Sequence, residues 1–258
     1  MAPGILRLHQ FLSKTGVFKR KQEIWDAVEK EEITVNDKAI VNPQFHLKDS
    51  SVIKWKGKVL ETQNELLYFL CNKPEHYLCS KLTKYDQRVK KRSIFTLVKG
   101  VSELVKNTLS AVGRLDEDSC GLLIVTNDGD FNHKVAHPDS EIVKNYRVLL
   151  DKKISPRQKG EIERGVYIRL EENGKVMKYR TKPARVYYGR QRGVVVISLT
   201  EGKKREVRRI FEAVDCKVTG LQRVSIGGLK LEDVGLHEGL CKKVTKEYLE
   251  KRIFSKDK

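Results

Sequence analysis

The first sixty residues show apolar positions at helical spacing and then at strand spacing. Two groups of apolar residues at helical spacing predict two short helices, and Gly16, which follows the first group, is typical of a helix end. Two apolar runs then flank Asn36-Asp37, a dipeptide that favours a tight turn. The two helical groups are Leu8, Phe11 and Leu12, and Ile24, Trp25 and Val28. The two apolar runs are residues 33–35 and 39–41. We therefore predict a helix, a second helix and a hairpin in a small N-terminal α/β domain, residues 1–60.

From Glu61 onward, short strand patterns dominate and helical patterns are few. Strands are predicted at residues 66–70, 121–126, 146–150, 166–170, 184–188 and 193–199, and a capped helix with a charged tail at 245–258. A helix capped by Ser155 and ended by Gly165 lies between them, and an amphipathic helix is predicted over residues 204–214. Strands and helices do not alternate regularly. We therefore predict an α+β fold with a mainly antiparallel, mixed sheet in a second domain, residues 61–258.

The chain carries 52 lysine and arginine residues against 34 aspartate and glutamate residues, a formal net charge of +18. An excess of this size favours a polyanionic partner, and nucleic acid is the first candidate; a basic surface without a ligand is the alternative. Basic clusters at residues 19–21, 88–92 and 203–209 are spread along the chain and indicate a broad contact surface. Lys19 and Arg20 precede the second helix, where they could meet RNA phosphates or simply form a solvated helix face.

The cysteines are odd in number and widely spaced, at Cys71, Cys79, Cys120, Cys216 and Cys241. None belongs to a CxxC pair, and no histidine lies at the spacing that a zinc site needs. We therefore expect reduced, mostly buried thiols, no metal site and a reducing compartment. No apolar run reaches membrane-spanning length, and the N-terminus lacks the pattern of a secretory signal. These features predict a cytoplasmic protein that does not contact a membrane.

The segment from Ala111 to Gly129 carries the strongest chemical signal. A polar loop with Arg114 and Asp116 runs directly into the apolar strand 121–126, which can anchor it. An aspartate fixed at the edge of a rigid sheet suits nucleophilic or acid–base catalysis, because positioning sets the rate. For an isolated Arg-Leu-Asp sequence, the alternative is an ordinary surface loop with a helix-capping aspartate.

The length of this motif gives the chain a family likeness. Gly-Arg-Leu-Asp at 113–116, followed by Ser119, Gly121-Leu122-Leu123 and residues 126–129, resembles the catalytic motif of the ribosomal small-subunit (RsuA-like) pseudouridine synthases. Further segments agree with that family in order, at residues 70–80, 137–138, 144–148 and 201–213, then Leu221, Arg223 and Ile226-Gly227. Residues 6–53 resemble the ribosomal-protein-S-four-like (alpha-L) RNA-binding module. The resemblance therefore implies a pseudouridine synthase fold with an N-terminal RNA-binding domain.

The resemblance also implies catalytic roles. Asp116 would be the essential carboxylate, which breaks the bond between uracil and ribose by attack at the sugar or by assisting loss of the base. The freed uracil would rotate and be rejoined through carbon, so neither a cofactor nor a metal is implied. Arg114 would enter the RNA stack when the target nucleotide flips out, and Tyr146 would stack on the uracil. Arg208 would pair with Asp116 and keep it ionised.

Plainer alternatives stay open for these residues: a phosphate contact for Arg114 and Arg208, and a core position for Tyr146. The predicted RNA contacts also include Lys73, Lys203, Lys204, Arg205 and Arg209. The chain departs from the family pattern at Glu206, where glutamine is usual, and at His76, where glycine is usual. Further departures are Cys120, and Glu31-Glu32 and Asp37 in place of turn glycines.

The predicted partner is RNA, either ribosomal RNA or a ribosome-assembly intermediate, and we expect a monomer. A non-catalytic RNA-binding assembly factor is the alternative from another class, and the intact Asp116, Tyr146 and Arg208 weigh against it. The same chemistry on transfer RNA stays open, because no one-to-one code links side chains to RNA sequence here. A metal-dependent nuclease would need a second acidic cluster beside residues 116–118, and the sequence offers none.

Overall fold

The computed structural model describes residues 6–172 and 174–255, and the chain folds into two units. The first unit comprises residues 1–66 and 98–110, and the second comprises residues 67–97 and 111–258. The first has an apolar core of its own, and the second has two apolar clusters. The first unit thus takes in a second segment that lies well beyond the predicted boundary at residue 60.

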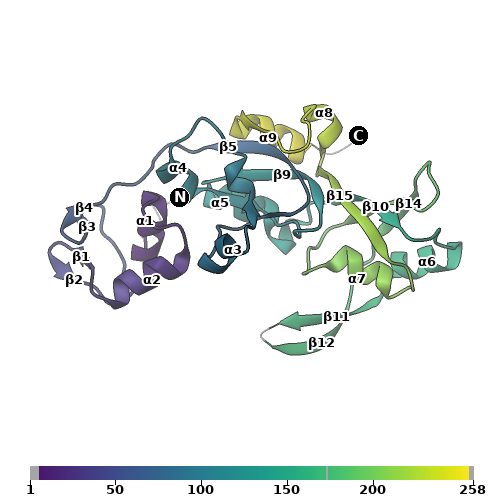
Figure 1. The fold of residues 1–258 in the computed structure, drawn as a ribbon, viewed down its shortest axis with the longest axis horizontal. Coiled ribbons are helices and arrows are strands. Elements are labelled where there is room, and N and C mark those ends of the chain that lie inside the picture. Colours follow the sequence, from purple (N-terminus) through teal and green to yellow (C-terminus); the bar gives the residue numbers. More distant parts are fainter. Residues whose placement is uncertain (1–5, 173, 256–258) are drawn as a thin grey trace. The chain divides into compact units, whose positions relative to one another are not determined.

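The first unit packs helices and a short sheet around its apolar core (Figure 1). Its elements are α1 (Leu8–Thr15), α2 (Lys21–Glu29), α4 (Glu103–Thr108) and a sheet in the order β2-β1-β3-β4, formed by Lys38–Ala39, Ile33–Val35, Ile53–Trp55 and Lys58–Val59. Gly16 has a left-handed φ of 73° and ends α1. Asn36 and Asp37, with φ of 50° and 64°, form the turn between β1 and β2. The predicted order of helix, helix and hairpin is confirmed.

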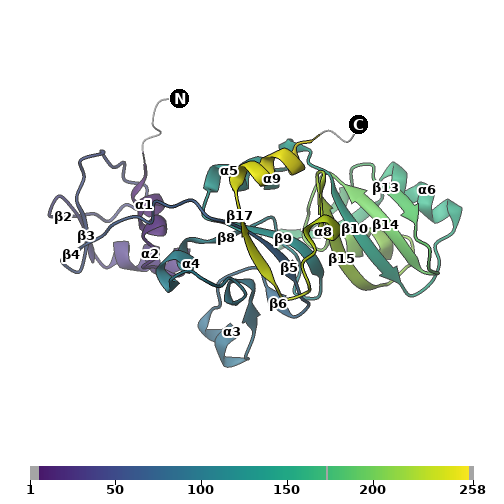
Figure 2. The ribbon, with the colours of Figure 1, turned by 90° about the horizontal axis from the view of Figure 1, so that it is seen from above.

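The second unit is built on a long, mixed sheet (Figures 1 and 2). Its main path runs β13-β14-β10-β15-β9-β5-β17, and every pairing on this path is antiparallel except that of β15 with β9. In that order the strands are Arg185–Tyr188, Val194–Leu199, Lys144–Leu150, Val218–Ile226, Cys120–Thr126, Tyr68–Lys73 and Cys241–Val244. Two short strands extend the sheet, β8 (Ser110–Val112) beside β9 and β16 (Leu229–Lys230) beside β15. The predicted α+β fold with a mainly antiparallel, mixed sheet is confirmed.

Helices pack against this sheet through the two apolar clusters. The first cluster joins α6 (Pro156–Arg164) and α7 (Glu206–Glu212) to β10, β13 and β14. The second joins α5 (Gly129–Ala136) and α9 (Lys246–Ile253) to β5 and β9. Smaller elements are β6 (Tyr77–Leu78), α3 (Lys84–Arg88), β7 (Arg92–Ser93), the 3-10 turns Ile94–Thr96 and Pro138–Ser140, the hairpin β11 (Tyr167–Glu172) and β12 (Lys175–Arg180), and α8 (Leu231–Val234). No helix in the described part of the chain is long and apolar enough to cross a membrane.

Some predicted elements differ from the structure in length. The helix predicted over 204–214 begins only at Glu206, because Arg205 adopts a left-handed φ of 55°. The strand β15 is absent from the prediction, since polar residues and a glycine interrupt its apolar pattern. The helix capped by Thr245 is confirmed as α9. The end of its predicted charged tail, residues 256–258, lies outside the described residues.

The expectation of reduced cysteines is wrong for one pair. Cys71 in β5 and Cys241 in β17 are register partners on neighbouring strands, and they form a disulfide. They are 170 positions apart in the sequence, so their spacing gives no sign that they meet. Cys79, Cys120 and Cys216 are free thiols. The bridge therefore ties the last strand of the sheet to β5 covalently.

The strands β9 and β15 approach closely at Gly121, which faces Arg223 in the parallel register. Gly121 has a φ of 107°, and a Cβ atom placed on it would lie 2.3 Å from the carbonyl oxygen of Arg223. Only glycine combines this conformation with so close a backbone approach. The point at which the sheet changes from antiparallel to parallel pairing therefore depends on Gly121.

We predict that Gly121→Ala lowers the free energy of unfolding by about 3 kcal/mol or more, because the added methyl group meets backbone on the next strand. Urea unfolding followed by circular dichroism measures this change. Gly129→Ala is the matched control, since Gly129 begins α5 and a Cβ there meets nothing within 4 Å. The control should leave stability unchanged or raise it by up to about 1 kcal/mol. Equal unfolding midpoints for the two variants would contradict the close contact.

Candidate active site

The loop from Gly113 to Ser119 connects β8 to β9 and carries the Arg-Leu-Asp sequence. It ends in a turn, in which the backbone N–H of Ser119 donates to the carbonyl oxygen of Asp116 at 3.2 Å. Leu115 is buried and packs into the first apolar cluster of the sheet. The loop is thus fixed in its middle by the core and at its end by β9.

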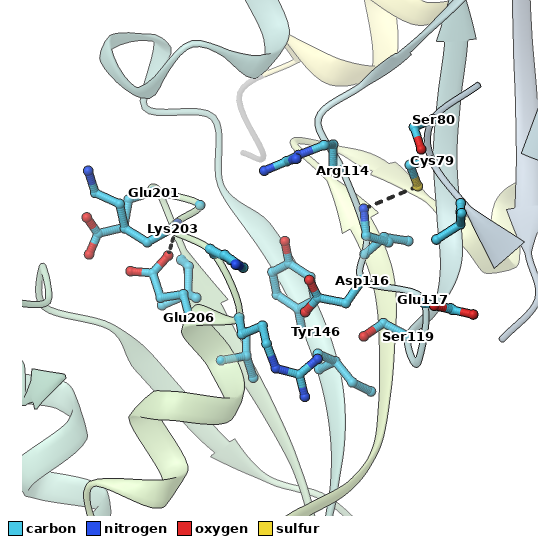
Figure 3. A pocket seen from close by; sticks show the side chains of 18 residues that line it. Cys79, Ser80, Arg114, Asp116, Glu117, Ser119, Tyr146, Glu201, Lys203 and Glu206 are labelled. Atoms are coloured by element: carbon cyan, nitrogen blue, oxygen red, sulfur yellow. Dashed lines mark hydrogen bonds between the residues drawn. The ribbon is translucent and has the colours of Figure 1, made fainter. Parts of the chain in front are cut away.

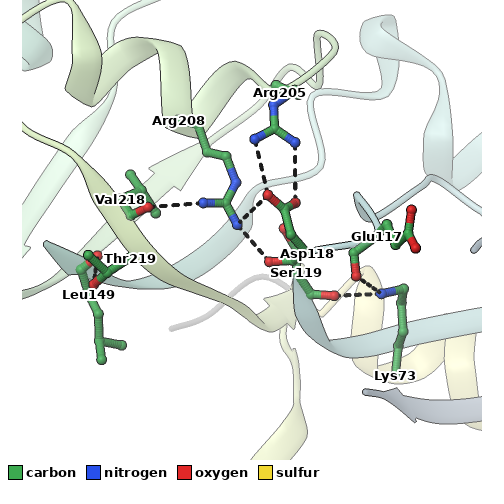
Figure 4. Close-up of polar contacts among 9 residues, drawn as sticks. All are labelled: Lys73, Glu117, Asp118, Ser119, Leu149, Arg205, Arg208, Val218 and Thr219. Carbon is green, nitrogen blue, oxygen red and sulfur yellow. Dashed lines mark hydrogen bonds and ion pairs between the residues drawn. The ribbon is translucent and has the colours of Figure 1, made fainter. Parts of the chain in front are cut away.

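Lys73, at the end of β5, holds this loop from one side. Its side chain is fully buried, and the ammonium group donates to the carbonyl oxygens of Ser119 and Glu117 at 2.6 and 3.4 Å (Figure 4). It also donates to the carbonyl oxygen of Pro74 at 3.0 Å. Burial lowers the pKa of Lys73 below its ordinary value. The predicted RNA contact of Lys73 therefore needs correction, because its ammonium group is enclosed and already bonded to the loop.

Arg208, on α7, holds the loop from another element. Its guanidinium donates to the carbonyl oxygens of Asp118 at 2.6 Å and Val218 at 3.1 Å, and lies 3.2 Å from the Asp118 carboxylate (Figure 4). Arg205 binds the same carboxylate through two nitrogens, at 3.1 and 3.3 Å. Burial raises the pKa of Asp118, but the hydrogen bonds from Arg205 and the charge of Arg208 hold that pKa below its ordinary value. The predicted pairing of Arg208 with Asp116 is wrong in this structure, because Asp118 is the partner.

A cavity of about 420 Å³ opens beside this loop (Figure 3). The loop, β10, the end of β14 and the turn before α7 border it. Of the residues predicted from the sequence, the cavity brings together Arg114, Asp116, Tyr146, Lys203, Lys204 and Arg205. Lys73, Arg208 and Arg209 do not line it. Positively charged and acidic side chains thus share one cavity wall with a tyrosine ring.

Asp116 and Tyr146 both line this cavity, and Figure 3 shows the two side chains directed into it. The Asp116 carboxylate has no hydrogen bond or ion pair with any residue that the structure describes. Tyr146 lies on β10, is 8% exposed and packs into the first apolar cluster. The core position and the cavity position, which were alternatives for Tyr146, are therefore combined.

Basic side chains surround the opening of the cavity. Arg114 is exposed and forms no hydrogen bond within the described ranges. The Lys203 ammonium lies 5.1 Å from the centre of the Tyr179 ring, and Lys204 is exposed. Arg209 is bound to the chain itself, donating to the carbonyl oxygen of Lys204 at 2.9 Å. The free cations at the opening favour a polyanionic ligand.

The other predicted RNA contacts, Lys19 and Arg20, belong to the first unit. Lys19 is exposed just before α2. Arg20 is partly buried and pairs with Glu23 at 3.0 Å, so its charge is partly balanced. Across residues 6–172 and 174–255, no group of three or more histidine, cysteine, aspartate or glutamate side chains is arranged to hold a metal ion.

An acid pair at the cavity wall escaped the sequence reasoning. Glu201 and Glu206 both line the cavity and are 4% and 3% exposed. Burial, and then a hydrogen bond with Glu201, raises the pKa of Glu206 to about 8. The sequence gives two signals at Glu206: it stands where glutamine is usual in the family, and it is a lone acid within the basic run 203–209.

Comparison with known proteins gives one consistent result. The family model of RNA pseudouridylate synthases matches residues 67–213. A Vibrio cholerae protein named ribosomal small subunit pseudouridine synthase A is 31% identical, over 94% of this chain and 97% of that protein. A Bacillus subtilis protein named ribosomal large subunit pseudouridine synthase B is 32% identical, over 93% of this chain and 92% of that protein. A crystal structure of a pseudouridylate synthase has a TM-score of 0.65 at 25% identity, with 95% of this chain and 99% of that chain covered.

We predict that Lys73→Met lowers the free energy of unfolding by about 2 kcal/mol or more, because buried carbonyl groups lose their donor. Urea unfolding measures the loss. Lys204→Met removes the same charge from an exposed position and should change stability by less than about 0.5 kcal/mol. If the two variants unfold at the same urea concentration, the ammonium group of Lys73 does not hold the loop.

Proposed function

The chain belongs to the RNA pseudouridylate synthase family and to its RsuA-like members, and on this premise we propose that Asp116 is its catalytic carboxylate and ribosomal RNA its substrate. As a member, it is an isomerase that converts uridine in RNA to pseudouridine, and RNA is its partner. One observation carries the assignment of Asp116. Its carboxylate lines the cavity without a hydrogen bond or ion pair among the described residues, on a loop that Lys73 and Arg208 hold in place.

The proposed reaction uses Asp116 to break the bond between N1 of the uracil and C1′ of the ribose. The carboxylate either attacks C1′ or assists departure of the base. C5 of the rotated uracil then forms the new bond to C1′, and any bond between the carboxylate and C1′ breaks in that step. A carbon-bound proton at C5 leaves and N1 gains a proton, so atoms balance without a co-substrate. Tyr146 would support the rotating base with its ring, which a packed strand holds in one position.

Arg114 is proposed to stabilise the flipped-out nucleotide. A base that is stacked or paired cannot reach an enclosed carboxylate, so the nucleotide must leave the stack first. Arg114 is two residues from Asp116, is exposed, and has no internal partner in the part of the chain that the structure describes. It is therefore free to fill the space left by the base, while Lys203 and Lys204 contact phosphates. Arg205 lines the same cavity but binds the Asp118 carboxylate.

The proposed substrate is ribosomal RNA, and we assign it to neither the small nor the large ribosomal subunit. The relatives named above carry small-subunit and large-subunit names at nearly equal identity, so similarity favours neither. We infer that residues 1–60 form an S-four-like RNA-binding domain that presents Lys19 and Arg20 to RNA, followed by a catalytic domain. We also infer that the protein acts as a monomer in the cytoplasm.

We predict that Asp116→Asn abolishes pseudouridine formation while RNA affinity stays within about threefold, because the amide keeps the shape but cannot act as a carboxylate. Pseudouridine mapping in RNA from cells that contain the wild type, the variant or neither protein identifies the target, and an assay on that RNA measures the rate. Asp215→Asn, at an exposed position after α7, is the control and should retain full activity. Wild-type turnover by Asp116→Asn would refute the assignment.

We predict that Arg208→Lys lowers turnover at saturating RNA by about tenfold or more, with little change in RNA affinity. A lysine keeps the charge but cannot bind the carbonyl groups of Asp118 and Val218 and the Asp118 carboxylate together. Single-turnover kinetics separates the two effects. Arg209→Lys is the control on the same helix and should retain turnover. Equal turnover of the two variants would mean that Arg208 does not position the loop.

A further inference from the structure

Two buried carboxyl groups meet at the wall of the cavity, and the proposed reaction does not use them. Glu201 follows β14 and is 4% exposed, and Glu206 begins α7 and is 3% exposed. Figure 3 shows their carboxyl groups beside each other, next to Lys203. The turn of residues 202–205, which lines the cavity with its basic side chains, runs from one acid to the other.

Glu201 has the contacts of an ionised carboxylate. One oxygen accepts a hydrogen bond from the Tyr179 hydroxyl, and the other accepts one from the backbone N–H of Lys182 at 2.7 Å. Burial raises the pKa of Glu201, but the hydrogen bonds from Tyr179 and Lys182 help to hold that pKa below its ordinary value. Glu201 is therefore an acceptor, fixed by β12 and by the backbone after β12.

Only one of the two carboxyl oxygens of Glu206 accepts a hydrogen bond. Its Oε2 accepts a hydrogen bond from the backbone N–H of Lys203 at 2.8 Å. Its Oε1 is buried and accepts no hydrogen bond from any residue within 6–172 and 174–255. The carboxylate of Glu201 beside it can only accept. If Glu206 carries a proton, it can donate a hydrogen bond to the Glu201 carboxylate. Without that proton, two buried anions would lie beside each other and repel.

The charged groups that face this pair do not neutralise Glu206. The Lys203 ammonium lies over the Tyr179 ring at 5.1 Å from its centre, and Lys144 on β10 donates to the carbonyl oxygen of Ile142 at 3.1 Å. Burial, and then Arg223, lowers the pKa of Lys144 to about 8. The hydrogen bond to Glu201 raises the pKa of the Tyr179 hydroxyl to about 12. No ion pair of Glu206 exists among the described residues.

We propose that Glu206 is a positioning residue that works as a neutral carboxylic acid, donating its hydroxyl to Glu201 while its other oxygen holds the backbone of Lys203. The acid–carboxylate pair then closes the turn of residues 202–205 against β14 and directs its basic side chains to the cavity. This role rests on the proposed function only in that the cavity receives the target nucleotide. No net proton transfer is involved, because the proton stays on the pair.

The pair makes stability and turnover sensitive to alkaline pH. The pKa of Glu206 is raised from 4.5 to about 8, so between these values the folded chain holds a proton that the unfolded chain does not. The free energy of unfolding therefore falls as pH rises above about 4.5, and it levels off about one pH unit above the folded pKa of about 8. Turnover should fall about tenfold one pH unit above the ionisation of Glu206, as the turn opens.

The decisive variant is Glu206→Gln, whose amide can accept from Lys203 and donate to Glu201 at every pH. Relative to the wild type, its urea unfolding midpoint should rise steadily between about pH 5 and about pH 9. Its turnover should equal that of the wild type at neutral pH and should lack the alkaline fall. Glu212→Gln, at an exposed position of the same helix, is the control and should follow the wild type in both measurements.

Infrared spectroscopy tests the proton directly and needs no RNA. The wild type and Glu212→Gln at neutral pH should show the carbonyl stretch of a protonated carboxylic acid, which Glu206→Gln lacks and which titrates away on alkalinisation. Absence of that band at neutral pH would overturn the proposal, and so would an alkaline fall in turnover shared by Glu206→Gln. Failure of the wild type to modify any RNA would instead refute the proposed function, while the infrared and unfolding results would stand.

Discussion

Two cationic side chains bound to backbone carbonyl groups determine the position of Asp116. Lys73 comes from β5 and Arg208 from α7, and they bind the loop at Glu117, Asp118 and Ser119. A loop lacks the regular backbone hydrogen bonds of a helix or a sheet, so its buried carbonyl groups need hydrogen-bond donors from other parts of the chain. Because Lys73 belongs to the sheet and Arg208 to a helix packed on it, these two side chains attach the loop to the core of the unit. The close approach of β9 to β15 fixes the end of the same loop.

The internal use of cations changes what the net charge means. A formal charge of +18 favours a polyanionic partner, and the exposed cations around the cavity agree with that. Yet Lys73, Lys144 and Arg223 are buried, and they donate to carbonyl oxygens of the chain itself. Composition cannot separate a cation that binds RNA from one that binds backbone, because both raise the net charge equally. The separation requires burial, which only the fold supplies.

The parts of the fold that follow local rules were predictable. Helices with a cap or a terminal glycine and strands with a clear alternation are present, and the Asn36-Asp37 turn joins β1 to β2. The strand β15 was missed because its sequence mixes polar and apolar residues. It forms a central strand because β10 and β9 pair with it on its two sides. The bridge between Cys71 and Cys241 was missed for a related reason. Pairing of β5 with β17 is a long-range register that no spacing encodes.

The site shows the same limit over three adjacent residues. The family resemblance implied one catalytic site that contains Arg114, Asp116 and Tyr146, but it paired Arg208 with Asp116, whereas the structure pairs Arg208 with Asp118. Successive side chains on a turn point in different directions, so each acid in 116–118 has its own environment. Lys91 binds the Glu117 carboxylate at 2.6 Å, and Arg205 and Arg208 bind that of Asp118. Of these three acids, only Asp116 keeps a carboxylate without a partner among the described residues. The cations nearest to this turn bind Glu117 and Asp118, and the catalytic role proposed for Asp116 rests on this difference among three neighbouring acids.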